Sequence, residues 1–200
     1  MCAALVAGTA ICAYAIEYNQ LRLAPRLDGE LLHVSAPNFS FLTGKSLERL
    51  KDGASVAFIA QMTVSTTPTY VMADARTVAR FAVSYDFWQE SFSVTRFAED
   101  KAGSGQKGTR SHLTGPAAEA WCLENLAINR ADLPTDRPFY VHLDLRVEDP
   151  RDQSGVIGDA GISISRLAEI FSRPAREKQD HWPLDSGPVR LDEIRKGTHG

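Results

Sequence analysis

His142 and Asp144 are the two residues whose types and spacing come nearest to a chemical site. They lie two apart in an alternating apolar and polar segment, so both should face one side of a strand, with Cβ atoms roughly 6.5–7 Å apart. That separation suits two ligands of one metal better than a direct hydrogen bond. Zinc needs a third and a fourth ligand, and the spacing of the other residues implies neither. We therefore favour a solvated strand face that holds a cross-strand ion pair.

The same polar face is also a candidate contact surface. Tyr140, His142, Asp144 and Arg146 alternate with apolar residues over 138–148, so they should point together away from the core. Tyr and Arg are favoured as anchors of protein interfaces. We interpret these four residues as a surface that binds a partner.

An acidic cluster follows this segment. Asp149, Asp152 and Asp159 come after Glu148 and surround two glycines, and such loops can bind calcium through carboxylate and carbonyl oxygens. The spacing departs from the helix-loop-helix calcium pattern, and Arg151 would repel a cation. A turn rich in Asp is the interpretation we favour, with calcium binding as the alternative.

The remaining reactive residues indicate no catalytic site and no cofactor. Cys122 has no His linked to it by a local motif, so it is predicted to be a small core residue. The glycine-rich stretch 103–109 lacks the Gly-Lys-Ser/Thr ending of a phosphate loop. A net charge of -3 does not favour a nucleic-acid partner.

The amino-terminal segment is typical of a protein that is exported. From Cys2 to Ile16 no residue is charged, and these 15 residues are fewer than the roughly 20 that a membrane-spanning helix needs. Ala13 and Ala15 form a small-x-small cleavage pattern, which predicts a signal peptide over residues 1–15 and a cut after Ala15. An uncleaved membrane anchor is the main alternative, followed by a lipoprotein or a buried helix.

The segments that would position these residues indicate a single α+β domain over 29–200, after a linker over 16–28. Consecutive strands with short links predict a mainly antiparallel sheet, either a meander or a sandwich, with two to three short packed helices. Strands are expected over 29–35, 54–66, 70–87, 91–97 and 138–148, with a final extended segment near 182–191. Helices are expected over 44–52 and 116–127 and from Ser163 onward, and a mobile surface loop over 98–112.

The order of these segments resembles a bacterial envelope family described as the domain of unknown function number 4390. The resemblance rests on the helix that ends in Lys51-Asp52-Gly53, the strands 55–64 and 140–148, the helix 117–126 and the segment 182–186. It covers residues 30–186. The chain lacks the Arg- and Trp-rich strand expected near 65–75. The resemblance implies an exported protein, sometimes encoded beside a membrane sensor kinase, and no catalytic residues.

Taken together, the sequence favours an exported periplasmic or secreted protein that acts as a non-enzymatic binding or accessory module. Its expected partner is another envelope protein, with a membrane sensor as one candidate. Two alternatives remain open. One is a metal-dependent enzyme that uses the His142 and Asp144 face, and the other is a structural domain stabilised by calcium at the acidic cluster.

Overall fold

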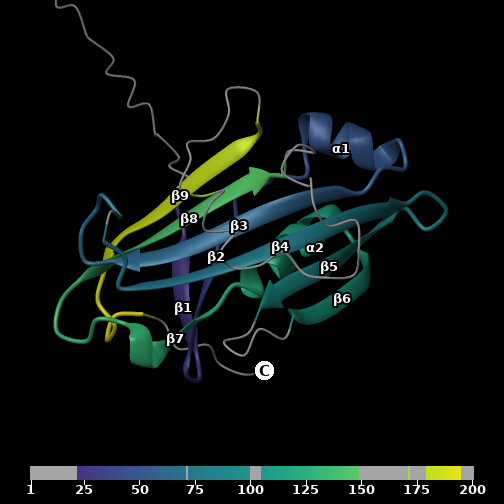
Figure 1. The fold of residues 1–200 in the computed structure, drawn as a ribbon. Helices are drawn as coiled ribbons and strands as arrows, with labels where there is room; N and C mark the ends of the chain where they lie inside the picture. Colours follow the sequence, from purple (N-terminus) through teal and green to yellow (C-terminus); the bar gives the residue numbers. More distant parts are fainter. Residues whose placement is uncertain (1–21, 71, 100–104, 149–170, 172–178, 195–200) are drawn as a thin grey trace, which may run out of the picture.

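Nine strands in two sheets, with two α-helices, form the part of the chain that the computed structural model describes, which is residues 22–70, 72–99, 105–148, 171 and 179–194. Neighbouring strands within each sheet run antiparallel. The larger sheet has the order β6-β5-β4-β3-β8-β9 (Figure 1). Its strands are β3 (Val56–Ser65), β4 (Ala75–Asp86), β5 (Ser91–Glu99), β6 (Gly105–Leu113), β8 (Phe139–Val147) and β9 (His181–Val189). The predicted α+β class with mainly antiparallel strands is confirmed.

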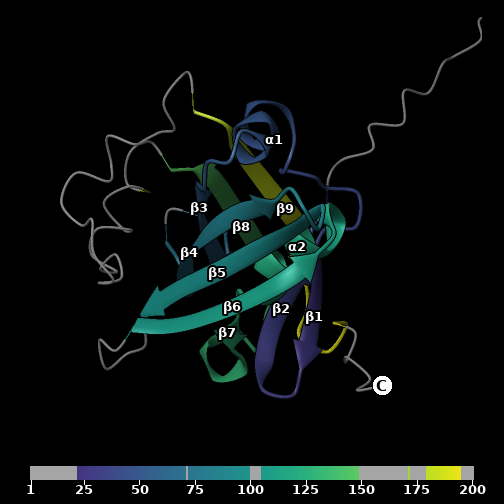
Figure 2. The same ribbon diagram turned by 90° about the vertical axis from the view of Figure 1, so that its right-hand side faces the viewer.

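A smaller sheet and the helices complete the fold. The small sheet contains β1 (Ala24–Asp28), β2 (Leu31–Ser35) and β7 (Ile128–Asn129), and a single 3-10 turn, η1 (Arg130–Asp132), follows β7. The helices are α1 (Gly44–Lys51) and α2 (Gly115–Glu124). The strands β1 and β2 run across the direction of the larger sheet, and α2 packs against both β2 and β5 (Figures 1 and 2).

The core lies on one face of the larger sheet. Period-two alternation along β8 places Phe139, Val141, Leu143 and Leu145 in the core, each completely buried, with Val147 packed against them. This confirms the inward face predicted for 138–148. The central strand β3 is different, because all ten of its residues are buried. Both faces of the sheet are therefore covered at β3.

The helices expected over 44–52 and 116–127 are confirmed, and a side-chain cap is observed at the start of α2 but not of α1. Thr43 and Thr114 precede α1 and α2 in extended conformation. The hydroxyl of Thr114 accepts a hydrogen bond from the backbone N–H of Ala117, which satisfies one of the free donors of the first turn. A proline in the first turn of α2 matches the position where its missing N–H costs nothing.

The prediction of a mobile loop over 98–112 is wrong for most of that range. β5 extends to Glu99, and β6 begins at Gly105 and pairs with it antiparallel, with Thr95 opposite Thr109. The hydroxyls of these two threonines lie 3.1 Å apart. Backbone hydrogen bonds to a neighbouring strand can hold an edge strand that has few apolar residues of its own. The lack of large apolar residues therefore misled the prediction.

The expected linker over 16–28 also differs from the structure. Residues 24–28 form β1, and Leu23 and Leu27 are buried in the core. Pro25 fits here because β1 is an edge strand, where a residue without an N–H is tolerated. The folded part of the chain therefore starts before residue 29. The expected signal segment, the acidic cluster and most of the helix from Ser163 lie outside the described residues.

Helices of the described segments are all too short or too polar to cross a membrane.

Candidate functional site

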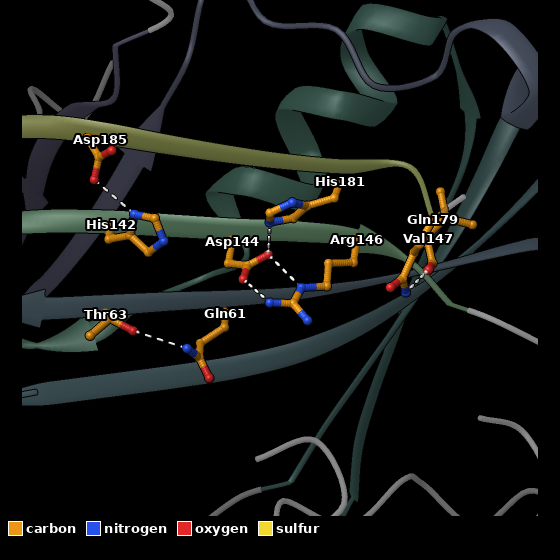
Figure 3. Close-up of polar contacts among 9 residues, drawn as sticks. All are labelled: Gln61, Thr63, His142, Asp144, Arg146, Val147, Gln179, His181 and Asp185. Carbon is orange, nitrogen blue, oxygen red and sulfur yellow. Dashed lines mark hydrogen bonds and ion pairs between the residues drawn. The ribbon is translucent and has the colours of Figure 1, made fainter. Parts of the chain in front are cut away.

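A compact ion-pair group occupies the polar side of β8. Arg146 donates from Nε to Asp144 Oδ1 at 2.9 Å and from one terminal nitrogen to Oδ2 at 2.5 Å, which makes the contact bidentate. His181 on β9 places Nε2 at 2.9 Å from the same Oδ1 (Figure 3). The ring of Phe171 lies under the guanidinium, 4.9 Å from it. Each charge of Asp144 and Arg146 is thus matched within the protein.

Burial corrects the prediction that this strand face is solvated. Asp144 is 8% exposed, Arg146 5% and Glu148 3%. Glu148 accepts two hydrogen bonds from Arg80 on β4, at 2.7 and 3.0 Å. Alternation of polar and apolar residues shows which side chains share a face, but a buried charge that is paired gives the same pattern as a solvated one. Asp144 and Arg146 are therefore internal residues.

The side chains of β3 that neighbour this group are also polar. Gln61 stands opposite Asp144 and Thr63 opposite His142 in the strand register, and both are buried. Gln61 donates to the Thr63 hydroxyl at 3.4 Å (Figure 3). Its carbonyl oxygen is buried and has no hydrogen-bond partner among the described residues. The second face of the sheet thus carries a polar band that crosses β3, β8 and β9.

The His142 cluster, which we define as Tyr70, Tyr140, His142 and Asp185, lies at one end of this band. His142 Nδ1 is 2.8 Å from Asp185 Oδ1 on β9, so the predicted cross-strand pair is present. The Tyr70 hydroxyl donates to the same oxygen at 2.5 Å, and its ring stacks on His142 with centroids 4.4 Å apart. His142 is 20% exposed at its side chain and Asp185 54%. The cluster is ordered and also reachable from solvent.

Electrostatics in this cluster favour the neutral phenol of Tyr70. Partial burial raises the pKa of Tyr70 above its ordinary range, and the hydrogen bond to Asp185 raises it further. Tyr70 also adopts a left-handed backbone conformation, with φ at 53°. Such a conformation is uncommon for a residue other than glycine and persists when its surroundings hold it. The contacts to Asp185 and His142 are contacts of that kind.

The geometry does not bring the predicted metal ligands together. His142 pairs with Asp185, whereas Asp144 pairs with Arg146 and His181, so the two side chains serve separate groups. Within the described segments no group of three or more His, Cys, Asp or Glu side chains could hold a metal ion. The other predicted site residues, Asp149, Asp152 and Asp159 for calcium and Ala13 and Ala15 for cleavage, lie outside the described residues.

Cys122 belongs to the core, as predicted. It is 1% exposed on α2, and burial raises the pKa of its thiol, with Glu119 adding to the effect. Glu119 itself accepts hydrogen bonds from the backbone N–H groups of Phe41 and Leu42 at 2.7 and 2.6 Å. A neutral buried thiol is a poor nucleophile, and Cys122 is one of the side chains that fill the core.

An exposed aromatic pair was not predicted from the sequence. Phe87 and Trp88, which we call the aromatic tip, lie in the turn between β4 and β5 and are 53% and 97% exposed. A usable signal was present, since Asp-Phe-Trp-Gln-Glu separates two alternating strand segments. Large aromatic residues in such a turn do not belong to the core-facing pattern of either strand, so they point to another use.

No family model, curated protein or solved structure matches this chain. The resemblance to the envelope family therefore stays a prediction.

Proposed function

We propose that this protein is an exported, non-enzymatic binding module of the cell envelope and that the His142 cluster is its contact surface. The observation that carries the proposal is the cluster itself, in which Tyr and His side chains are partly exposed and already hydrogen-bonded in place. The amino-terminal segment and the family resemblance favour export. Another envelope protein is the expected partner, and a membrane sensor is one candidate.

Preorganisation makes this surface suited to binding. Ordering a side chain at an interface costs about 0.5–1.5 kcal/mol, and less is lost when internal contacts already fix the rotamer. Tyrosine is among the residues enriched at the energetic centres of interfaces. Asp144 and Arg146 were also expected in this surface, but their burial removes them from it. Tyr70 and Asp185 take their place beside Tyr140 and His142.

The binding proposal can be tested by quantitative co-purification. The tagged full-length protein would be isolated from the envelope of its native cells beside Tyr140→Ala and His142→Ala variants. We expect each variant to recover the specific partner at least about tenfold less well, as truncation of interface anchors does. Glu48→Ala is the control, because Glu48 is exposed on α1, an element separate from the strands that carry the cluster. Equal recovery by all variants, with unchanged melting curves, would contradict the proposal.

Export has a separate test. The protein expressed with its leader in a Gram-negative host should be recovered outside the cytoplasm with Ile16 as its first residue. An intact mass that retains Met1 in a soluble cytoplasmic product would refute export without affecting the binding result.

A further inference from the structure

The aromatic tip exposes two large apolar side chains to solvent. Trp88 is 97% exposed and Phe87 53%, and they are adjacent in the chain. Tryptophan is highly buried on average in folded proteins, so a large aromatic residue left almost wholly in water is informative. Tryptophan is also the residue type most enriched at the energetic centres of protein interfaces. The tip therefore has the residue types and the exposure expected of an interface anchor whose binding partner is absent from the structure.

The turn that carries the tip is held in one conformation. The Asp86 carboxylate accepts hydrogen bonds from the backbone N–H groups of Trp88 at 2.9 Å and Gln89 at 3.1 Å. Glu90 closes the turn in a left-handed conformation, with φ at 48°. Such Asp-to-backbone hydrogen bonds are a standard way to fix a tight turn. Trp88 is thus presented on an ordered backbone.

Phe87 is supported from below by other side chains. Its ring meets that of Tyr85 edge to face, with centroids 5.4 Å apart and planes at 84°. Tyr85 in turn packs on Phe92, with centroids 5.0 Å apart. Phe87 also lies over Gly53, where an added Cβ would be only 3.8 Å from the ring. These contacts account for the buried half of Phe87 and leave Trp88 as the projecting residue.

The tip is separate from the His142 cluster. Thr63 pairs with His142 near one end of β3, whereas Val56 at the other end pairs with Val83, and β4 then continues to the tip. Figure 1 shows the β4–β5 turn on the side of the sheet that carries α1. A ligand on one surface would not cover the other.

Charge indicates what kind of partner fits. Asp86 and Glu90 lie directly on either side of the aromatic pair and are exposed, while Arg49, Lys51 and Asp52 at the nearby end of α1 add one net positive charge. The turn is therefore apolar at its centre and acidic at its immediate border, which Asp86 and Glu90 form. An anionic lipid surface would repel that border, whereas a protein pocket edged by Lys or Arg would complement it.

The cavity beside α2 of a second copy is a poor match for the tip. A cavity beside α2 has apolar walls that include Phe39 and Leu123, but Glu119 and Glu124 also line it. Its volume is about 130 Å³, below the roughly 300–1,000 Å³ of ordinary ligand pockets. The exposed Glu124 there would face the acidic border of the tip. Size and charge both disfavour self-docking at this cavity.

We propose that Trp88, with Phe87 beside it, docks into an apolar pocket of a different protein whose border carries Lys or Arg. The acidic residues Asp86 and Glu90 orient the approach, and Trp88 fills the pocket. This second surface does not depend on the His142 cluster, so the two surfaces would allow the protein to bridge two partners.

Photo-crosslinking in the native cells tests this proposal. The full chain would carry p-benzoylphenylalanine in place of Trp88, with the same probe at the exposed Asp136 as the matched control. We expect position 88 alone to give a discrete adduct whose crosslinked peptide contains apolar residues and Lys or Arg. Tyr140→Ala should leave that adduct unchanged. The same adduct from both positions, an adduct of the chain with itself, an acidic peptide or no adduct would each overturn the proposal.

Competition measures how much binding energy the tip contributes. Unlabelled parent protein or variant would compete with the photo-crosslinking protein for the partner found at position 88. Trp88→Ala should compete at least about thirtyfold less well than the parent protein, the effect of losing an interface anchor worth 2 kcal/mol or more. Glu90→Lys should also compete less well, and the loss should shrink as salt is added. Equal competition by Trp88→Ala would refute the anchor role, and no effect of Glu90→Lys at low salt would refute the basic border.

Vesicles serve to distinguish a membrane surface from a protein. The parent protein and Trp88→Ala would be mixed with phosphatidylcholine vesicles, with and without phosphatidylglycerol. We expect neither protein to float with either kind of vesicle. The emission of Trp88, obtained by subtracting the spectrum of Trp88→Ala from that of the parent protein, should show no blue shift when vesicles are added. A blue shift that Trp88→Ala abolishes would identify the tip as a membrane anchor and overturn the protein-docking proposal.

Discussion

Two regions of the larger sheet differ in whether their conspicuous side chains have partners within the chain. At the β8–β9 end, Tyr70, His142 and Asp185 share one hydrogen-bonded network and remain partly reachable from solvent. At the β4–β5 end, the turn satisfies its backbone through Asp86 and leaves Trp88 in water. Internal contacts hold both ends in place, but only the second leaves a large apolar side chain uncovered.

This difference separates side chains that stabilise the fold from side chains that are available to a partner. Asp144 and Arg146 are charged and conspicuous in the sequence, yet they are buried and serve each other. Trp88 contributes little to the packing of its own chain. For a binding module, exposure on an ordered backbone is therefore a better guide to function than chemical type.

The largest effect is expected from Asp144→Ala. This variant removes the carboxylate that pairs with buried Arg146 and with His181, and loss of one partner of a buried pair costs about 3–5 kcal/mol. Urea unfolding would measure the change. Asp136→Ala breaks an exposed pair with Arg137 and should cost less than about 1 kcal/mol. Similar losses in both variants would mean that Asp144 is not internal.

An intermediate effect is expected at the His142 cluster. His142→Ala removes the contact with Asp185 and the stacking on Tyr70, and should cost about 1 kcal/mol. A double-mutant cycle with Asp185→Asn should give a coupling energy of about 0.5–1 kcal/mol, because the two side chains touch directly. Additive losses in the two variants would show that the contact carries no energy.

A smaller effect is expected from alkaline pH. Burial and Asp185 raise the pKa of Tyr70 in the folded state, while the phenol of the unfolded chain ionises near pH 10. The stabilisation is complete below about pH 10 and is lost as the pH rises above it, since only the unfolded state then releases the proton. Solvent screening limits the loss at pH 11 to less than about 1 kcal/mol. The free energy of unfolding of Tyr70→Phe should decline less than that of the parent protein between about pH 9 and 11. Identical declines would contradict the raised pKa of Tyr70.

The predictions from sequence succeeded where a local pattern determined the structure. Strict alternation identified the inward face of β8, including Leu143, and the helices expected over 44–52 and 116–127 are present as α1 and α2. β6 was missed because it is an edge strand that depends on β5 as its neighbour, and its own residues carry no strand pattern. Pairing between two segments, even consecutive ones such as β5 and β6, is not recorded in the spacing of either one.

The same limit applies to the candidate site. Spacing placed His142 and Asp144 on one face and suggested a cross-strand pair, which β9 supplies through Asp185. It could not show that His181 would approach Asp144 and that this carboxylate would be buried with Arg146. Burial depends on what covers a face, and one strand holds no information on that.

The smallest effect on stability is expected from Trp88→Ala, although the residue is the largest side chain at its end of the sheet. Because Trp88 is 97% exposed, its truncation removes almost no buried surface and should change the free energy of unfolding by less than about 0.5 kcal/mol. Phe87→Ala should cost more, about 1 kcal/mol, since half of that ring packs on Tyr85 and Gly53. Urea melts of the two variants decide the point. If Trp88→Ala destabilised the protein more than Phe87→Ala, the tryptophan would be packing within its own chain. The contrast between the His142 cluster, whose side chains bond to one another, and the aromatic tip, whose tryptophan is free to bind a partner, would then fail. The reason for expecting a partner at the tip would fail with it.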